Sequence, residues 1–248
     1  MTATIPTWAS TAVQLAYPTI FVTVSGAHLY GFASHDSDLD LRATHLLPAT
    51  EVLGLHTGPE TLQSDTWRDG VELDVVSHDL LKFARLLTSR NGYVLEQILS
   101  PLVIHTSDTH RALIDLSPGL ITRHHAHHYL GFAATQLRLL DTANEIKPAL
   151  YTLRVLHTGL HLMRTGTVQA DLRTFDTPAY VADLMALKLD AEHSDFPAAM
   201  RPEFLADITR LRSELEAARD SSPLPAHPDP DAVTALHNLV ITTRLTTI

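Results

Sequence analysis

Residues 25–42 read Ser25-Gly-Ala-His-Leu-Tyr-Gly-Phe-Ala-Ser-His-Asp-Ser-Asp-Leu-Asp-Leu-Arg42 and carry the strongest structural signal of the chain. They overlap the end of the β-branched run Ile20-Phe-Val-Thr-Val-Ser25, which predicts a buried strand. That strand runs into a small-residue turn at Gly26 and Ala27. From residue 38 to residue 44, polar and apolar residues alternate, which predicts a strand with one buried face. The stretch therefore predicts a strand, a glycine turn and a second strand.

Two aspartates of the second strand are the first candidate site residues. Asp38 and Asp40 are two positions apart, so the period of two places both carboxylates on one face. Asp74, in a predicted third strand over residues 71–76, would add a third carboxylate if that strand lies beside the second. Neighbouring carboxylates repel each other unless a cation neutralises them, and an oxygen-rich site favours Mg²⁺ or Mn²⁺. The alternatives are a solvated acidic turn for Asp38 and Asp40 and an exposed strand residue for Asp74.

Three carboxylates on neighbouring strands that face a glycine turn are typical of a two-metal phosphoryl-transfer site. Two metal ions about 3.5–4 Å apart can activate an attacking hydroxyl and stabilise the leaving oxygen. Backbone N–H groups at the Gly26 turn can approach phosphate closely, and a short helix after the turn would offer its N-terminus. His28 and Tyr30 would lie in that helix, beside a nucleotide; packing of Tyr30 against the sheet is the alternative.

Before Pro101 the chain is rich in predicted strands. The third strand follows the turn Arg68-Asp69-Gly70, and residues 79–87 predict a helix capped by Ser77 or His78. Residues 54–68 are polar and turn-rich and predict a mobile excursion.

After Pro101 the apolar spacing is helical, with helices predicted over residues 124–140, 148–164, 177–190, 202–219 and 231–245. The predicted fold class is α+β. A mixed β-sheet with helices would occupy residues 1–108, and an all-helical domain would occupy residues 109–248.

Composition excludes several classes of site and partner. The chain has no cysteine, so disulfides, zinc thiolate sites and cysteine nucleophiles are excluded. No run approaches the roughly 20 apolar residues that span a bilayer, and the first 18 residues carry no Lys or Arg, so a cytoplasmic protein without membrane partners is expected. The net charge of −10 disfavours duplex DNA. Residues 111–175 hold seven basic and four acidic residues, which favours a small anion such as a nucleoside triphosphate, or a short nucleic-acid end.

Basic and aromatic residues follow one stripe of the helix predicted over residues 148–164 and at its start. At helical spacing they are Lys147, Tyr151, Arg154, His157, His161 and Arg164. A cationic ridge of this kind could hold a triphosphate, with Lys as a point charge and Arg as a planar fork. A solvated face is the alternative. A second basic cluster, residues 123–128, has histidines at metal-capable spacing but no accompanying carboxylate, so the start of a helix is the favoured interpretation.

These motifs resemble a known family. A glycine turn, some ten residues, Asp-x-Asp and a distant strand Asp resemble the signature of the DNA polymerase β-like nucleotidyltransferase superfamily. The longer string Ser-Gly-x-x-x-Tyr-Gly…Ser-Asp-x-Asp-x-Arg resembles its RNA-ligase-associated branch of predicted nucleotidyltransferases. Asn91-Gly-Tyr-Val-Leu-Glu96 resembles the Asn-Pro-x-x-x-Glu helix of that branch, and Lys147…Tyr151…Arg154 resembles its helical Lys…Arg element. The resemblance covers residues 21–172.

The resemblance implies a Mg²⁺- or Mn²⁺-dependent nucleotidyltransferase. Such an enzyme moves a nucleoside monophosphate from an NTP, for example ATP, to a hydroxyl acceptor and releases pyrophosphate. The implied acceptor is an RNA end, in repair or processing. The implied catalytic residues and metal ligands are Asp38, Asp40 and Asp74. The implied nucleotide-binding residues are Ser25, Gly26, Ala27, His28, Tyr30, Ser37, Arg42, Lys147, Tyr151 and Arg154.

One position departs from the motif, because Ala27 stands where the family usually has Ser or Gly. The backbone N–H remains there, but the hydroxyl is lost. Two other functions therefore stay open: a non-catalytic nucleotide- or RNA-binding module, and an NMP transferase that acts on a protein or a small molecule. The net charge of −10 slightly favours the latter, because a long RNA would need a broader basic surface.

Overall fold

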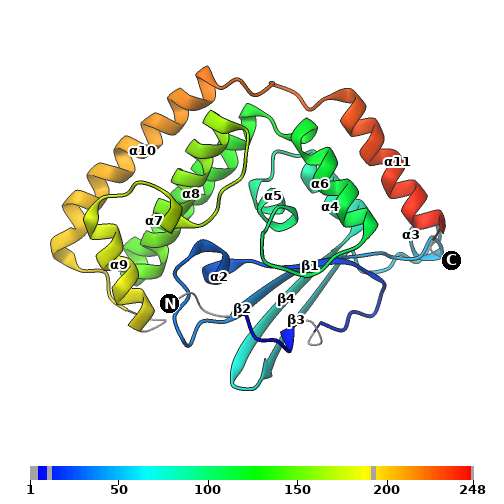
Figure 1. Cartoon of the computed structure of the whole chain (residues 1–248), viewed down its shortest axis with the longest axis horizontal. Helices are drawn as coiled ribbons and strands as arrows, with labels where there is room; N and C mark the ends of the chain where they lie inside the picture. Colours follow the sequence, from blue (N-terminus) through cyan, green and yellow to red (C-terminus); the bar gives the residue numbers. More distant parts are fainter. Residues whose placement is uncertain (1–4, 10–12, 191–193, 247–248) are drawn as a thin grey trace. The chain divides into compact units, whose positions relative to one another are not determined.

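A computed structural model describes most of the chain: residues 5–9, 13–190 and 194–246. They form two compact units. The sheet unit comprises the described residues of three segments, 5–26, 38–121 and 227–246. The helical unit comprises those of two segments, 27–37 and 122–226. Each unit is therefore assembled from segments that are far apart in the sequence, as the colours of Figure 1 show.

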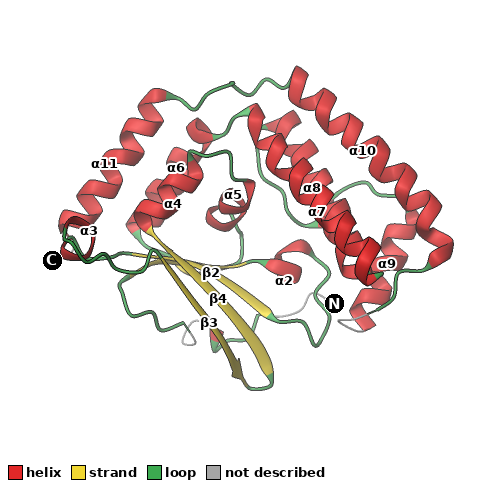
Figure 2. Ribbon diagram, turned by 180° about the vertical axis from the view of Figure 1, so that it is seen from behind, coloured by secondary structure: helices red, strands yellow, loops and turns green. Residues whose placement is uncertain are grey.

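The sheet has five strands among the described residues, in the order β3-β4-β2-β1-β5. Strands β2, β3 and β4 can be followed in Figures 1 and 2. Their bounds are β1 Thr19–Val24, β2 Leu39–His45, β3 Thr61–Arg68, β4 Val71–Asp79 and β5 Val103–His105. Strands β2 and β4 pair in parallel, and the other neighbours pair antiparallel, so the sheet is mixed, as predicted.

One face of the sheet carries an apolar core. Leu39 and Leu41 of β2 pack with Leu73 and Val75 of β4, and residues of β1 join the same cluster. Burying each of these side chains stabilises the unit by about 1.5–3 kcal/mol. Because strand side chains alternate, the residues between these leucines and valines point to the opposite face.

The opposite face of the sheet is covered by helices. They are α4 Leu80–Leu87, α5 Gly92–Ile98 and α6 Asp108–Leu120. Phe21 of β1 meets Phe83 of α4 edge-on and stacks on His110 of α6, with ring centroids 5.3 and 4.4 Å apart. Thr23 of β1 donates to the carbonyl of Gln97 in α5 at 2.9 Å.

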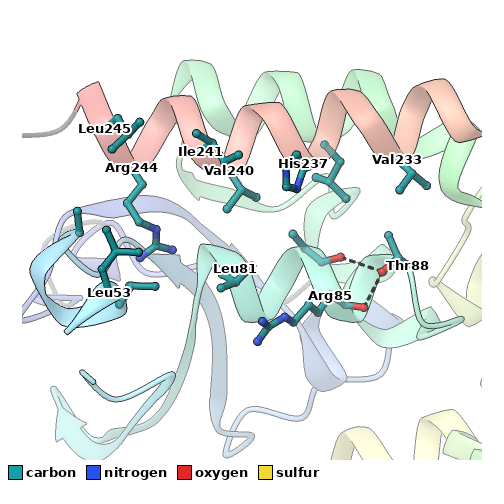
Figure 3. Close-up of a pocket in the computed structure, with 14 residues that line it drawn as sticks. Leu53, Leu81, Arg85, Thr88, Val233, His237, Val240, Ile241, Arg244 and Leu245 are labelled. Atoms are coloured by element: carbon teal, nitrogen blue, oxygen red, sulfur yellow. Dashed lines mark hydrogen bonds between the residues drawn. The ribbon is translucent and has the colours of Figure 1, made fainter. Parts of the chain in front are cut away.

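Helix α11, Pro230–Thr246, belongs to the sheet unit and is anchored by a buried ion pair. Its Arg244 donates to Asp79, at the end of β4, at 2.9 Å. Next to this ion pair, α11 and α4 leave an apolar cavity of about 640 Å³, lined by Arg244, by Leu81 of α4 and by Val240 and Ile241 of α11 (Figure 3). The ion pair therefore fixes one end of α11, while the helix closes only partly over α4.

The helical unit packs around one central helix. Its elements are α7 Ala126–Ala143, α8 Ile146–Thr165, α9 Ala179–Asp190 and α10 Arg201–Ser221, together with α2 Gly26–Tyr30 from residue 27 onward. Helix α8 is buried on nearly every side. Gly159 allows α7 to approach it, since a Cβ at this position would lie 2.8 Å from the Cβ of Tyr129.

The predicted α+β fold class is confirmed, and the five predicted C-terminal helices lie within three residues of their predicted bounds. The helix predicted over residues 79–87 is α4, but its cap is Asp79, which accepts from the N–H of Leu81 at 2.9 Å. Ser77 and His78 are not the cap, because β4 continues through them.

Among the described α-helices and strands, four were not predicted: α3 Thr50–Leu53, β3, β5 and α6. The prediction of a mobile excursion over residues 54–68 is wrong for its second half, because residues 61–68 form β3. Asp69 and Gly70 both have positive φ, 51° and 81°, which is the backbone of a tight hairpin that folds β3 back on β4. Helix α6 was also missed; its cap is Ser107, which accepts from the N–H of His110 at 3.2 Å.

The division of the chain into two domains, residues 1–108 and residues 109–248, stays a prediction. The compact units group the chain differently, because residues 27–37 belong to the helical unit and α11 belongs to the sheet unit. Among the described residues, no helix combines the length and the hydropathy that crossing a membrane requires.

Candidate active site

Two of the three predicted carboxylates lie side by side in the sheet unit. In the parallel register of β2 and β4, Asp40 is paired with Asp74. Residues in register project to the same face of a sheet, so both side chains lie opposite the apolar core. The Asp40 side chain is 14% exposed and that of Asp74 is 34% exposed. The structure therefore brings these two predicted catalytic residues together and keeps both partly out of bulk water.

Arg42 joins the two carboxylates. Its Nη2 donates to Asp40 Oδ1 at 2.6 Å and to Asp74 Oδ2 at 2.8 Å. Its Nε donates to the hydroxyl of Tyr93 at 2.7 Å. Burial by itself would lower the pKa of Arg42, but the interactions with Tyr93, Asp40 and Asp74 outweigh it and raise that pKa. The guanidinium is therefore a permanent cation between the two aspartates.

The motif at residues 91–96 explains how Tyr93 reaches Arg42. Asn91 caps α5, because its side chain accepts from the N–H of Tyr93 at 3.0 Å. The cap fixes the first turn of α5, from which the Tyr93 hydroxyl meets the guanidinium. Glu96, in the same helix, is buried.

The glycine turn packs directly on one of the carboxylates. Gly26 has φ +61°, and a Cβ built at this position would overlap Oδ2 of Asp40. The N–H of Ser25 donates to the backbone carbonyl of Asp40 at 2.9 Å, and Ser25 is 1% exposed. Glycine is required at this turn because both its positive φ and the close carboxylate exclude a side chain.

A divalent cation fits this donor set in part. A single cationic nitrogen of Arg42 already contacts both carboxylates, so their oxygens converge on one positively charged atom. Asp38 lies just before β2 and is half-buried. Within the described residues, no three His, Cys, Asp or Glu side chains are close enough together to hold a metal ion. Asp40 and Asp74 thus suit a hard cation, and Asp38 does not stand with them as an assembled third ligand.

Sequence reasoning missed one carboxylate of this face. Asp65 of β3 is paired with Asp74 in the antiparallel register, so Asp40, Asp74 and Asp65 follow one another across three strands. Asp65 is exposed. The turn Arg68-Asp69-Gly70 was the available signal, because a tight hairpin before β4 implies a partner strand.

Several predicted nucleotide-binding residues lie in the helical unit. Tyr30 of α2 is 2% exposed, and the Arg154 guanidinium of α8 lies 3.7 Å from its ring centroid. The ring of Tyr151 meets Tyr30 edge-on at 5.4 Å. Ala27 is buried and His28 is half-buried. The structure therefore clusters Tyr30, Tyr151 and Arg154 by cation–π and edge-to-face contacts.

The predicted cationic ridge on α8 does not form as one surface. Arg154 is 2% exposed and His157 is 9% exposed, and the His157 ring stacks on Phe175 at 5.3 Å. The exposed Arg164 donates to Glu214 at 3.3 Å. Lys147 is half-buried at the start of the helix. The stripe is interrupted because neighbouring elements cover α8 on several sides, which helical spacing alone could not show.

His124 and His125 lie in a 3₁₀ turn, Arg123–His125, and His127 and His128 lie in the first turn of α7; the described residues contain no group of three that could hold a metal ion. His125 accepts from the N–H of Thr122 at 3.1 Å through its Nδ1. Burial, helped by the charge of Arg154 and by His125, lowers the pKa of His128 to about 4. His128 is therefore neutral in the folded protein at neutral pH.

The neutral His128 predicts acid sensitivity of the helical unit. An ordinary histidine protonates near pH 6.5, so between pH 6.5 and about 4 the unfolded chain binds a proton that the folded chain excludes. The contribution of His128 to stability is complete above pH 6.5 and is lost as the pH falls toward 4. We expect His128→Gln to flatten the fall of the unfolding midpoint over this range, measured by circular dichroism. The exposed neighbour variant His127→Gln should keep the wild-type slope; equal slopes for all three proteins would contradict the assignment.

A mixed sheet that presents paired aspartates beside a glycine turn, in a chain that also carries a helical unit, is the architecture expected of polymerase β-like nucleotidyltransferases. A model of the RNA repair pathway DNA polymerase beta family matches residues 7–242. The chain therefore belongs to this family, and the resemblance inferred from the motifs is confirmed.

Two individual proteins that resemble the chain share less than a third of their residues with it. An uncharacterized protein from Methanocaldococcus jannaschii is 29% identical over 158 residues, which are 63% of this chain. The match spans 65% of the length of that protein, just under two thirds. A crystal structure of a nucleotidyltransferase-like protein from Exiguobacterium sibiricum is 13% identical, covers 91% of this chain and 70% of its own, and has a TM-score of 0.31.

Proposed function

We propose that the chain is a metal-dependent nucleotidyltransferase that moves a nucleoside monophosphate from an NTP to the hydroxyl of an RNA end. One observation carries the proposal: Asp40 and Asp74 are in register on adjacent strands, beside the Gly26 turn. Two carboxylates that converge on one cation suit the chemistry of phosphoryl transfer, in which charge must be neutralised around phosphate.

The reaction consists of four events: attack, bond cleavage, release of pyrophosphate and transfer of a proton. The hydroxyl oxygen of the acceptor attacks the α-phosphorus, and the bond between this phosphorus and the β-phosphate oxygen breaks. Pyrophosphate leaves, and the hydroxyl proton passes to a base. Asp74 is the proposed residue that helps to activate the hydroxyl, because it is the more exposed of the two paired carboxylates. Gly26 and Ala27 are proposed to contact the β- and γ-phosphates by backbone N–H groups.

A divalent cation, Mg²⁺ or Mn²⁺, held by Asp40 and Asp74, would supply Lewis-acid stabilisation of the phosphate oxygens, and Asp38 stays only a predicted third ligand. Arg42 holds Asp40 and Asp74 together through its hydrogen bonds to both carboxylates. The same guanidinium would have to share these carboxylates with the cation. Lys147 and Arg154 remain predicted partners of the triphosphate, and Tyr151, His28, Tyr30, Ser25 and Ser37 remain predicted residues of the nucleotide site.

The acceptor is the least constrained part of the proposal. The family description, with its RNA repair pathway, supports an RNA end. The net charge of −10 supports a short acceptor rather than a long duplex. An NMP transferase for a protein or a small molecule would use the same carboxylates, so only the labelled product separates the two.

The experiment supplies each of the four α-³²P-labelled NTPs, with Mg²⁺, to the protein and a short single-stranded RNA. The expected product is RNA that carries the label, with release of pyrophosphate. A matched RNA that ends in a 2′,3′-dideoxynucleotide should stay unlabelled because it lacks the attacking hydroxyl. EDTA should stop the reaction, and Mn²⁺ should restore it.

Two results would redirect the proposal. Label on the protein or on an added small molecule, with none on RNA, would leave the transfer chemistry and replace the acceptor. NTP binding without any turnover on any acceptor would show a non-catalytic binding module, to which the Ala27 departure would then be relevant.

A further inference from the structure

A fully buried lysine lies outside the residues assigned so far. Lys188 of α9 is 0% exposed, and its Nζ donates to Ser34 Oγ at 2.9 Å. An ammonium group is strongly hydrated in water, and burying it is costly unless its hydrogen bonds are replaced. A lysine on a helix with exposed positions could reach solvent easily. Its hydrogen bond to Ser34 therefore replaces part of the hydration that the ammonium loses on burial.

Lys188 is part of a group of hydrogen bonds that closes a turn. The N–H of Ser34 donates to Ser37 Oγ at 3.0 Å, the two hydroxyls lie 2.9 Å apart, and the N–H of Ser37 donates to the carbonyl of Ser34 at 3.3 Å. Ser34 is 3% exposed and Ser37 is 6% exposed. A charged donor polarises the hydroxyls to which it is linked, so the turn is held more firmly than by neutral groups.

The same segment, residues 27–37, is held by the helical unit at two further places. Tyr30 packs under the Arg154 guanidinium of α8. Gly31 has φ +89° and lies so close to Asp171 that a Cβ would overlap Oδ1 of that carboxylate. The segment between the first two strands is therefore fixed by residues that follow it by more than a hundred positions.

We propose that Lys188 is a positioning residue of the nucleotide site. It is too deeply buried to touch a substrate, and it acts through Ser34 on the turn that ends at Ser37. Ser37 is joined by a peptide bond to Asp38, the first aspartate of the Asp-x-Asp motif. Within the helical unit, Lys188 thus holds the turn that immediately precedes Asp38 in the sequence. This inference rests on the proposed function, because a positioning residue requires a site to position.

Lys188→Met is the decisive variant, because it keeps an unbranched side chain, one heavy atom shorter, and removes the ammonium group. Lys188→Met removes a buried hydrogen bond to Ser34, so a purely structural role predicts a change in stability without a change in ligand affinity. Positioning predicts that the dissociation constant of ATP with Mg²⁺, measured by calorimetry, rises about tenfold, as expected from the loss of one charge-assisted hydrogen bond. Hydrogen–deuterium exchange of residues 32–38 should become faster. GTP, CTP and UTP are tested in the same way.

Two controls separate positioning from general loosening. Leu215→Ala removes a fully buried side chain of α10, and so destabilises the helical unit without touching the turn. At temperatures below the midpoint of its thermal unfolding, Leu215→Ala should keep the wild-type dissociation constant for ATP and the wild-type hydrogen–deuterium exchange of residues 32–38. Ser34→Ala should weaken NTP binding, and the double variant with Lys188→Met should be no weaker than Lys188→Met alone, because both changes break one interaction.

Wild-type affinity and wild-type exchange in Lys188→Met would overturn the inference. An equal change in Leu215→Ala would also overturn it, since the effect would then reflect stability alone. If the wild-type protein binds none of the four NTPs, the proposed function fails, whereas the exchange of residues 32–38 still decides whether Lys188 holds the turn.

Discussion

Asp40→Asn is expected to slow nucleotidyl transfer by at least about a thousandfold, because charge stabilisation worth several kcal/mol is lost and each 1.36 kcal/mol is tenfold in rate. Oδ1 of Asp40 accepts a hydrogen bond from Arg42, and Oδ2 of Asp40 lies against Gly26. An amide has the same shape but no negative charge, so it cannot hold a divalent cation as a carboxylate does.

The fold should survive this substitution. The amide oxygen can still accept from Arg42, and Arg42 keeps its bond to Asp74. We expect the free energy of unfolding to fall by only about 1–2 kcal/mol, the difference between a charged and a neutral hydrogen bond. Transfer is measured with labelled NTP and RNA, and unfolding by denaturant titration.

Asp115→Asn is the matched control, because it makes the same change at an exposed position of α6 in the same unit. It should transfer at the wild-type rate. A wild-type rate in Asp40→Asn would remove the paired carboxylates from the mechanism, whatever the family of the chain.

Gly26→Ala is expected to abolish transfer and to destabilise the sheet unit by more than the roughly 1–2 kcal/mol that an L-residue loses in the left-handed region. Gly26 has φ +61°, and the added methyl group would overlap the carboxylate of Asp40. The turn can accept alanine only if Asp40 moves, and moving Asp40 separates it from Arg42 and from Asp74.

Gly70→Ala separates backbone strain from steric overlap. Gly70 also has a positive φ, +81°, but nothing lies within 4 Å of the position of its Cβ. This variant should lose only the roughly 1–2 kcal/mol of backbone strain and should retain transfer. Both free energies of unfolding come from denaturant titration. If the two variants lose the same stability and the same activity, the close approach of Gly26 to Asp40 has no role.

The Gly26 turn and Asp40 were predicted correctly from the sequence, because both depend on local features. The period of two placed Asp40 on the face opposite Leu39 and Leu41, and the spacing from Gly26 to Asp40 was sufficient to suggest the family. The neighbouring position of Asp74 was only a conditional expectation. It depended on a parallel pairing of β2 with β4, which joins residues 34 positions apart.

Where sequence reasoning failed, the missing information was the identity of the packing partner. Strand β3 is mostly exposed, so its residues show no apolar alternation and resemble a loop. The segment forms a strand because its backbone pairs with β4, which its own side-chain pattern does not indicate. The same pairing places Asp65 opposite Asp74. The stripe on α8 had helical spacing, yet it was divided among separate neighbours, with Arg154 against Tyr30 and His157 against Phe175.

Local patterns alone established that this chain holds a strand, a glycine turn and an acidic strand, followed by helices, because backbone geometry and side-chain periodicity act over a few residues. Long-range packing settled the rest: the register that pairs Asp40 with Asp74, the arginine between them, and the assignment of residues 27–37 to the helical unit. These features depend on contacts between distant segments, and the free energy of such contacts belongs to no single stretch of sequence.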